Sequence, residues 1–217
     1  MRILTAVAVG ASLFACAKQP ATNTSNTAAP ATASSGTLNS AGANAAAPAE
    51  QASAPAAAYQ RYFNERWGRG GAAVTPAEVA AMMRSQTPQQ AVNALYGTGE
   101  NSRWDTVASG IAKGDPAWLE VAVRLSEGTD AGTADEFGMA AQDALTTNPA
   151  GALRLLSRIP MGTGGCSENG FEVGSEQARA YYNTAIASVG TVTEPALQQI
   201  KNGCLSELRK RLGNIPG

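Results

Sequence analysis

The chain has 217 residues, a formal net charge of −1, 6% aromatic residues and no histidine. A charge so close to zero offers no basic face to nucleic acid. Without histidine the chain lacks the usual general base near pH 7, the Ser-His and Cys-His nucleophile pairs, and the commonest zinc and haem ligand. We therefore expect no nucleic-acid partner, no metal and no cofactor.

The first residues have the pattern of an export signal. Met1 and Arg2 form a short positive start, and residues 3–14 are almost wholly apolar. A run of this length is too short for a membrane-spanning helix, which needs about 20 residues. It is typical of the apolar region of a secretory signal peptide.

The end of this apolar run, Leu13-Phe14-Ala15-Cys16, resembles the lipobox of bacterial lipoproteins. In that family a signal peptidase cuts before the cysteine, after a diacylglycerol has been attached to its thiol. The resemblance implies that residues 1–15 are a cleaved signal peptide and that Cys16 is the lipidation site in the cell envelope. By analogy with enterobacterial lipoproteins, Ala17 implies the outer membrane, facing the periplasm, rather than the inner membrane. The alternative is an ordinary signal cut after Ala15 or Ala17, which leaves a soluble periplasmic protein.

Residues 16–58 follow as the lipidated cysteine and a linker. From Lys18 to Ala58 the chain is built almost entirely from Ala, Thr, Ser, Asn, Pro, Gln and Gly, with Lys18 and Glu50 as the only charged residues. Such a stretch buries too little apolar surface to offset the entropy lost on ordering, so we expect it to be disordered. It serves either as a leash that lets the domain leave the lipid surface or as a passive spacer.

Residues 59–217 have the pattern of a helical domain. Capping residues followed by Pro, or by Glu or Gln three positions on, predict helix starts near 75, 87, 115, 133 and 148, with another near 102. The start at 133 rests on Thr133-Ala134-Asp135-Glu136. Apolar residues at helical spacing form five stripes: Tyr59, Tyr62, Phe63 and Trp67; Trp104, Val107, Ala108 and Ile111; Trp118, Val121, Ala122 and Leu125; Tyr182, Ala185, Ile186 and Val189; and Leu197, Ile200, Cys204 and Leu208.

No alternating strand pattern of useful length appears, so we expect an all-α fold. Short antiparallel helices would pack as hairpins, in an irregular bundle or a short HEAT-like stack. The segment from Gly114-Asp115-Pro116 through Leu156 resembles uncharacterised helical proteins exported by proteobacteria. This resemblance implies no known activity.

Two cysteines remain once Cys16 is assigned to lipid. Cys166 lies in a glycine-rich segment and Cys204 on the apolar stripe of the last helix. An even pair in an oxidising compartment favours a structural disulfide. The alternatives are a redox pair or a reactive thiol, but a redox pair usually has the Cys-x-x-Cys spacing, which is absent here.

The other motifs give little support to a catalytic site. Residues 162–165 are glycine-rich, but no Lys follows them as in a phosphate-binding loop. Glu168 and Glu172 are the best candidates for carboxylate catalysis on a glycan. The excess of acids from Asp115 to Asp143 is either a patch for a basic partner or a set of helix caps. The basic residues 209–211 end the last helix, where cations complement the helix dipole.

These observations favour a membrane-tethered, non-catalytic lipoprotein whose helical domain acts as a protein-interaction module for an envelope protein not identified by the sequence. One alternative is an inhibitor or immunity protein against a cell-wall-active enzyme. A second is a carboxylate-dependent glycan hydrolase.

Overall fold

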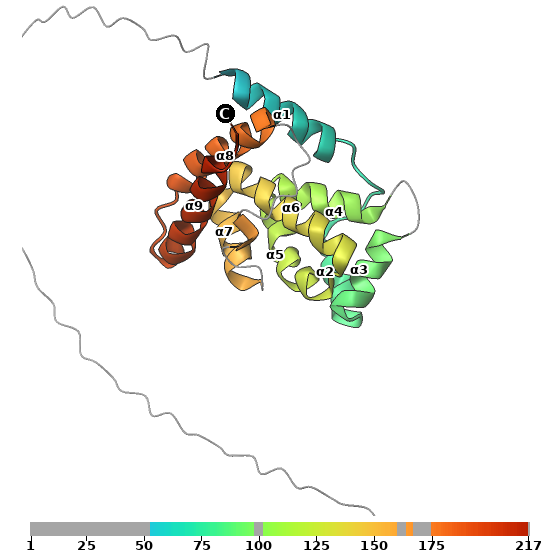
Figure 1. Ribbon diagram of the computed structural model, residues 1–217. Helices are drawn as coiled ribbons and strands as arrows, with labels where there is room; N and C mark the ends of the chain where they lie inside the picture. Colours follow the sequence, from blue (N-terminus) through green and yellow to red (C-terminus); the bar gives the residue numbers. More distant parts are fainter. Residues whose placement is uncertain (1–52, 98–101, 160–163, 167–174, 217) are drawn as a thin grey trace, which may run out of the picture. The chain divides into compact units, whose positions relative to one another are not determined.

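The computed structural model describes residues 53–97, 102–159, 164–166 and 175–216. Within these ranges the chain forms nine α-helices and three short 3-10 helices, with no strand (Figure 1). The all-α class and the disulfide are confirmed, whereas the packing as antiparallel hairpins stays a prediction. The α-helices are α1 (Ser53–Trp67), α2 (Pro76–Ser85), α3 (Pro88–Tyr96), α4 (Arg103–Ala112), α5 (Pro116–Leu125), α6 (Ala131–Thr147), α7 (Pro149–Arg158), α8 (Ser175–Gly190) and α9 (Gln198–Gly213); the 3-10 helices are η1 (Ser126–Gly128), η2 (Gly164–Cys166) and η3 (Pro195–Leu197).

Helix α6 lies in the middle of the helical unit. It packs against α4, α7, α8 and η2, and Figure 1 shows it between α4 on one side and α8 with α9 on the other. Its residues Phe137 and Leu145 are almost fully buried, as are Trp104 of α4 and Tyr181 of α8. The core of the unit is therefore organised around α6.

The helix starts follow the predicted caps at five of six positions. The Thr75 and Thr87 hydroxyls accept hydrogen bonds from the backbone N–H groups of Glu78 and Gln90, whose side chains in turn accept from the backbone N–H groups of the two threonines. The starts at 102, 115 and 148 are also confirmed, each with a side-chain cap. These caps satisfy backbone donors that the first helical turn leaves unpaired.

A helix does begin near 133, but the cap predicted at Thr133 is wrong, because α6 begins at Ala131 with Asp130 as its cap. The Thr133 hydroxyl accepts a hydrogen bond from the Asp130 N–H at 2.9 Å and donates to the Asp130 carboxylate at 2.9 Å. Thr133 is thus the third residue of the helix, which closes the capping box, and not the N-cap that begins it. Glu136, predicted to close the box, is instead half-buried on the first turns of α6.

The first helix also begins earlier than expected, at Ser53 and not at Tyr59. Alanine has the highest helix propensity, so the alanines before Tyr59 can extend a helix that the aromatic face stabilises. Ala58 is buried with Tyr59, Phe63 and Trp67, and α1 packs on α8 and α4.

The predicted apolar stripes face the core. All four residues of the α4 stripe are fully buried, and each other stripe has one half-buried member: Tyr62, Val121, Ile186 and Ile200. Among the described residues, no helix combines the length and the apolar character that crossing a membrane requires.

Candidate functional site

The predicted disulfide joins Cys166 of η2 to Cys204 of α9. The two Cα atoms are 5.4 Å apart, and both side chains are fully buried. The bond joins η2 to the last helix, α9, and η2 also packs on the central helix, α6. This linkage stabilises the scaffold that supports the remaining sites.

A buried polar junction, formed by Tyr59, Trp67, Asp143 and Thr146, fastens α1 to α6. The Tyr59 hydroxyl donates to one Asp143 carboxylate oxygen at 2.9 Å, and the Trp67 indole N–H donates to the other at 2.6 Å. The Tyr59 hydroxyl also lies 3.2 Å from the Thr146 hydroxyl. Tyr59 and Trp67 are eight residues apart on α1, so both face the same side of the helix.

Burial dominates the electrostatics of this junction. The Asp143 side chain is 2% exposed, and burial raises its pKa to about 6, although the hydrogen bonds from Trp67 and Tyr59 oppose the rise. Burial and the neighbouring Asp143 carboxylate raise the pKa of Tyr59 well above its usual range. Because both carboxylate oxygens accept from α1 and solvent barely reaches them, we interpret the junction as structural.

The edge of the junction is closed by Arg66. Its guanidinium lies 5.1 Å from the centre of the Trp67 ring, and it donates to the Tyr62 hydroxyl at 3.2 Å and to the Met139 sulfur at 2.8 Å. The charge therefore lies against an aromatic face, a favourable arrangement for a cation. Next to Asp143 on α6, Gln142 is fully buried, and its amide has no hydrogen-bond partner among the residues that the structure describes.

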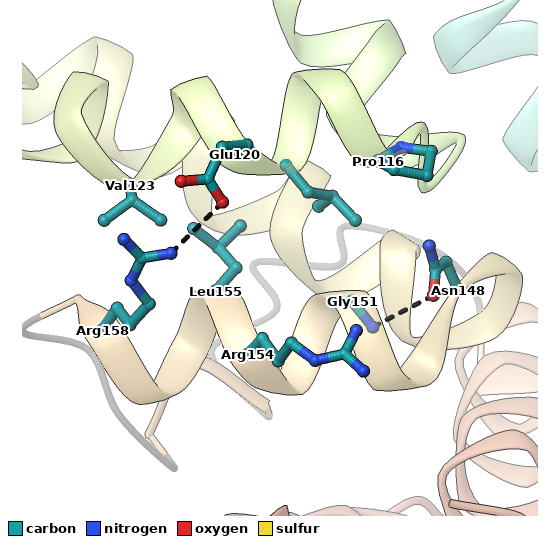
Figure 2. Close-up of a pocket in the computed structure, with 9 residues that line it drawn as sticks. Pro116, Glu120, Val123, Asn148, Gly151, Arg154, Leu155 and Arg158 are labelled. Atoms are coloured by element: carbon teal, nitrogen blue, oxygen red, sulfur yellow. Dashed lines mark hydrogen bonds and ion pairs between the residues drawn. The ribbon is translucent and has the colours of Figure 1, made fainter.

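A surface groove between α5 and α7 is the best candidate for a binding site (Figure 2). Its volume is about 260 Å³. Its apolar floor includes the buried side chains of Leu119 and Leu155 and the half-buried side chain of Val123. The charged side chains that border it, Glu120, Arg154 and Arg158, are exposed. The lining residues are Pro116, Leu119, Glu120, Val123, Asn148, Gly151, Arg154, Leu155 and Arg158.

Two ion pairs stand at this groove. Arg158 reaches from α7 across to Glu120 on α5, with 3.3 Å between the charged atoms, as Figure 2 shows. Arg154, one turn earlier on α7, pairs with Glu194, which precedes η3, at 2.5 Å. All four side chains are substantially exposed, from 43% for Glu194 to 72% for Glu120.

Close helix packing fixes one end of the groove. Asn148 caps α7 by accepting from the Gly151 N–H at 3.0 Å, while its amide donates to the Gly114 carbonyl at 2.8 Å. A Cβ atom on Gly151 would lie 2.6 Å from a Leu119 methyl carbon, so a larger residue there would require the Leu119 side chain to move. A hydrogen bond between the turn before α7 and the turn before α5 therefore fixes this end of the groove.

A second hollow, of about 430 Å³, lies between the end of α3 and the start of α6. Tyr96 forms part of its lining. Among the described residues, Tyr96 is the large hydrophobic side chain that is exposed, at 47%.

The other predicted site residues have different fates. The lipidation site Cys16 and the candidate acids Glu168 and Glu172 lie outside the described residues. The basic residues 209–211 are exposed at the end of α9. The acids from 115 to 143 form no single patch: Asp115 and Asp130 cap helices, Glu120 borders the groove and Asp143 is buried.

Sequence reasoning missed both the polar junction and the groove. The partners of Asp143 are 76 and 84 residues away along the chain, and Arg154 and Glu194 are 40 apart. A clue existed in Asp143 itself, a charged residue that follows Gln142 in a run from Met139 to Leu145 whose other members are apolar.

The described residues contain no group of three or more Cys, Asp or Glu side chains arranged to hold a metal ion. Comparison of the chain with protein-family models, with curated proteins and with solved structures finds no match.

Proposed function

We propose that this protein is an envelope lipoprotein whose helical domain binds a partner protein through the groove between α5 and α7. The observation that carries the proposal is the groove itself, which joins an apolar floor to paired charges on a scaffold fixed by helix caps and a disulfide. Apolar contact surrounded by polar groups is the usual composition of a protein interface.

The size of the groove supports a protein partner. A volume of about 260 Å³ is below the range of about 300–1,000 Å³ that is usual for pockets enclosing small-molecule ligands. It suits one or two side chains projecting from a partner. Such anchoring side chains supply most of the binding energy in many interfaces.

The lipid anchor and the envelope location rest on the N-terminal sequence. Leu13-Phe14-Ala15-Cys16 supports lipid attachment, and two or more acyl chains hold a protein stably on a membrane. The Cys166–Cys204 disulfide supports an oxidising compartment outside the cytosol.

The anchor is tested by mass spectrometry of the protein extracted from its native membrane, with a Cys16→Ala variant beside it. We expect a diacylglycerol mass on an N-terminal Cys16 and release of the variant from the membrane fraction. An unmodified wild-type N-terminus after Ala15 or Ala17 would contradict lipidation and leave a soluble exported protein.

The partner is tested by crosslinking the intact envelope, with the tagged protein expressed from its own promoter, and identifying the products by mass spectrometry. We expect one dominant partner protein. If that partner is a cell-wall hydrolase, the interaction is inhibition or immunity. If no protein crosslinks specifically, the interaction proposal is wrong.

A further inference from the structure

The basic side chains at the groove share a distinctive arrangement. Arg154 and Arg158 are four residues apart on α7, which places them one above the other on the same face of the helix. Their side chains are 54% and 51% exposed. The direct ion pairs formed among the described residues are the two that these arginines make.

Each arginine is held by a carboxylate from a different part of the chain. Glu120 lies on α5, and Glu194 precedes η3. One Arg154 nitrogen contacts both oxygens of Glu194, whereas Arg158 meets a single oxygen of Glu120. Guanidinium groups bind carboxylates with well-defined geometry. Because exposed ion pairs of this kind add little stability, an incoming carboxylate can replace either glutamate.

Resting on the proposed function, we propose that the groove takes an acidic segment of the partner protein. Two carboxylates of that segment, about one helical turn apart, bind Arg154 and Arg158. An apolar side chain between them enters the space between Leu119, Val123 and Leu155. When the groove is empty, Glu120 and Glu194 bind the two arginines. They therefore compete with the partner's carboxylates for the same guanidinium groups.

The chain's own N-terminal segment does not supply this occupant. From Lys18 to Ala52 its only acidic residue is Glu50, so it has no pair of carboxylates to offer. This segment is therefore not the acidic occupant of the groove.

The test uses the full chain and two synthetic helical peptides labelled with a fluorophore. One peptide has two glutamates four positions apart with a leucine between them, and the other has glutamines in place of the glutamates. Fluorescence anisotropy measures the dissociation constant of each. We expect the glutamate peptide to bind more tightly, and salt to weaken its binding more than that of the glutamine peptide.

Matched variants separate the two roles. Arg154→Gln and Arg158→Gln should abolish the preference for the glutamate peptide, whereas Arg61→Gln on the exposed side of α1 should preserve it. Glu120→Gln and Glu194→Gln should each tighten binding of the glutamate peptide by about 1.4- to 5-fold, the range expected for losing one exposed competing pair. Thermal melts of each variant confirm that it is folded.

Several results would overturn the inference: equal affinity for the two peptides, no binding of either at millimolar concentration, or a preference that survives the arginine substitutions. Its failure is distinguishable from that of the proposed function. An envelope partner that crosslinks at the groove, together with equal affinity for the two peptides, would leave the proposed function in place and contradict the acidic occupant. A preference for the glutamate peptide without any crosslinked partner would keep the acidic preference of the groove and contradict the proposed function.

Discussion

The buried carboxylate of Asp143 predicts an unusual dependence of stability on pH. Its pKa rises from 3.8 to about 6 in the folded protein, so the folded state binds the proton more tightly than the unfolded state does. By linkage, the free energy of unfolding increases as the pH falls from about 7 to about 4, and this contribution levels off below the unfolded pKa.

The magnitude follows from the size of the shift. One pKa unit corresponds to about 1.36 kcal/mol, so the gap of about two units sets an upper limit of about 3 kcal/mol for this contribution. In a domain of this size, 1 kcal/mol moves the melting temperature by about 2–4 °C. Other carboxylates act in the opposite direction; hydrogen bonds from Thr75 lower the pKa of Glu78, for example.

The assay therefore compares Asp143→Asn with the wild type by thermal melts at pH 4 to 7.5. Asparagine cannot titrate, so the wild type should gain stability relative to the variant as the pH falls through 6. Asp135→Asn, at an exposed position of the same helix, controls for the loss of a carboxylate. Parallel stability curves for Asp143→Asn and the wild type would refute the buried, charged junction.

Three further predictions concern the core. Replacing Cys166 and Cys204 by serine should lower the free energy of unfolding by up to about 4 kcal/mol, measured by urea denaturation, because the bond closes a loop with a sequence separation of 38; an unchanged midpoint would contradict the bond. Gly110→Ala should destabilise strongly in thermal melts, since a Cβ there would lie 2.1 Å from an indole ring of α5, whereas Gly190→Ala meets no atom within 4 Å and should be neutral or stabilising; equal effects would argue against the packing. Gln142→Met should raise the melting temperature, because it removes a buried amide that has no hydrogen-bond partner among the described residues. A lower melting temperature would mean that the amide is hydrogen-bonded.

Local chemistry explains which parts of the fold could be predicted. The boxes at Thr75 and Thr87 were recognisable because a cap, a proline and a reciprocal side chain lie within four residues. At the start of α6 two capping patterns overlap, and the sequence does not say that Asp130 prevails over Thr133. The aromatic face of α1 was predictable, but the extension to Ser53 depends on packing that no local pattern encodes.

The candidate groove could not be predicted for a physical reason. Its walls come from two helices about 30 residues apart, and its two arginines on α7 pair with Glu120 of α5 and with Glu194, which precedes η3. Neither the approach of α5 to α7 at Gly151 nor the pairing of Arg154 with Glu194 leaves a trace within a single helix. The disulfide was predictable because assigning Cys16 to lipid, as the N-terminal sequence suggests, leaves two cysteines and a single intramolecular pair.

The central claim is that the α5–α7 groove is the surface that binds the partner protein. The most direct measurement is site-specific photocrosslinking in living cells, with a photoreactive residue at Val123 in the groove or at the exposed Gln60 of α1 as the control. We predict one discrete crosslinked protein from position 123 that is absent from position 60. Equal products from both positions, or a product from position 60 alone, would contradict the assignment of the groove.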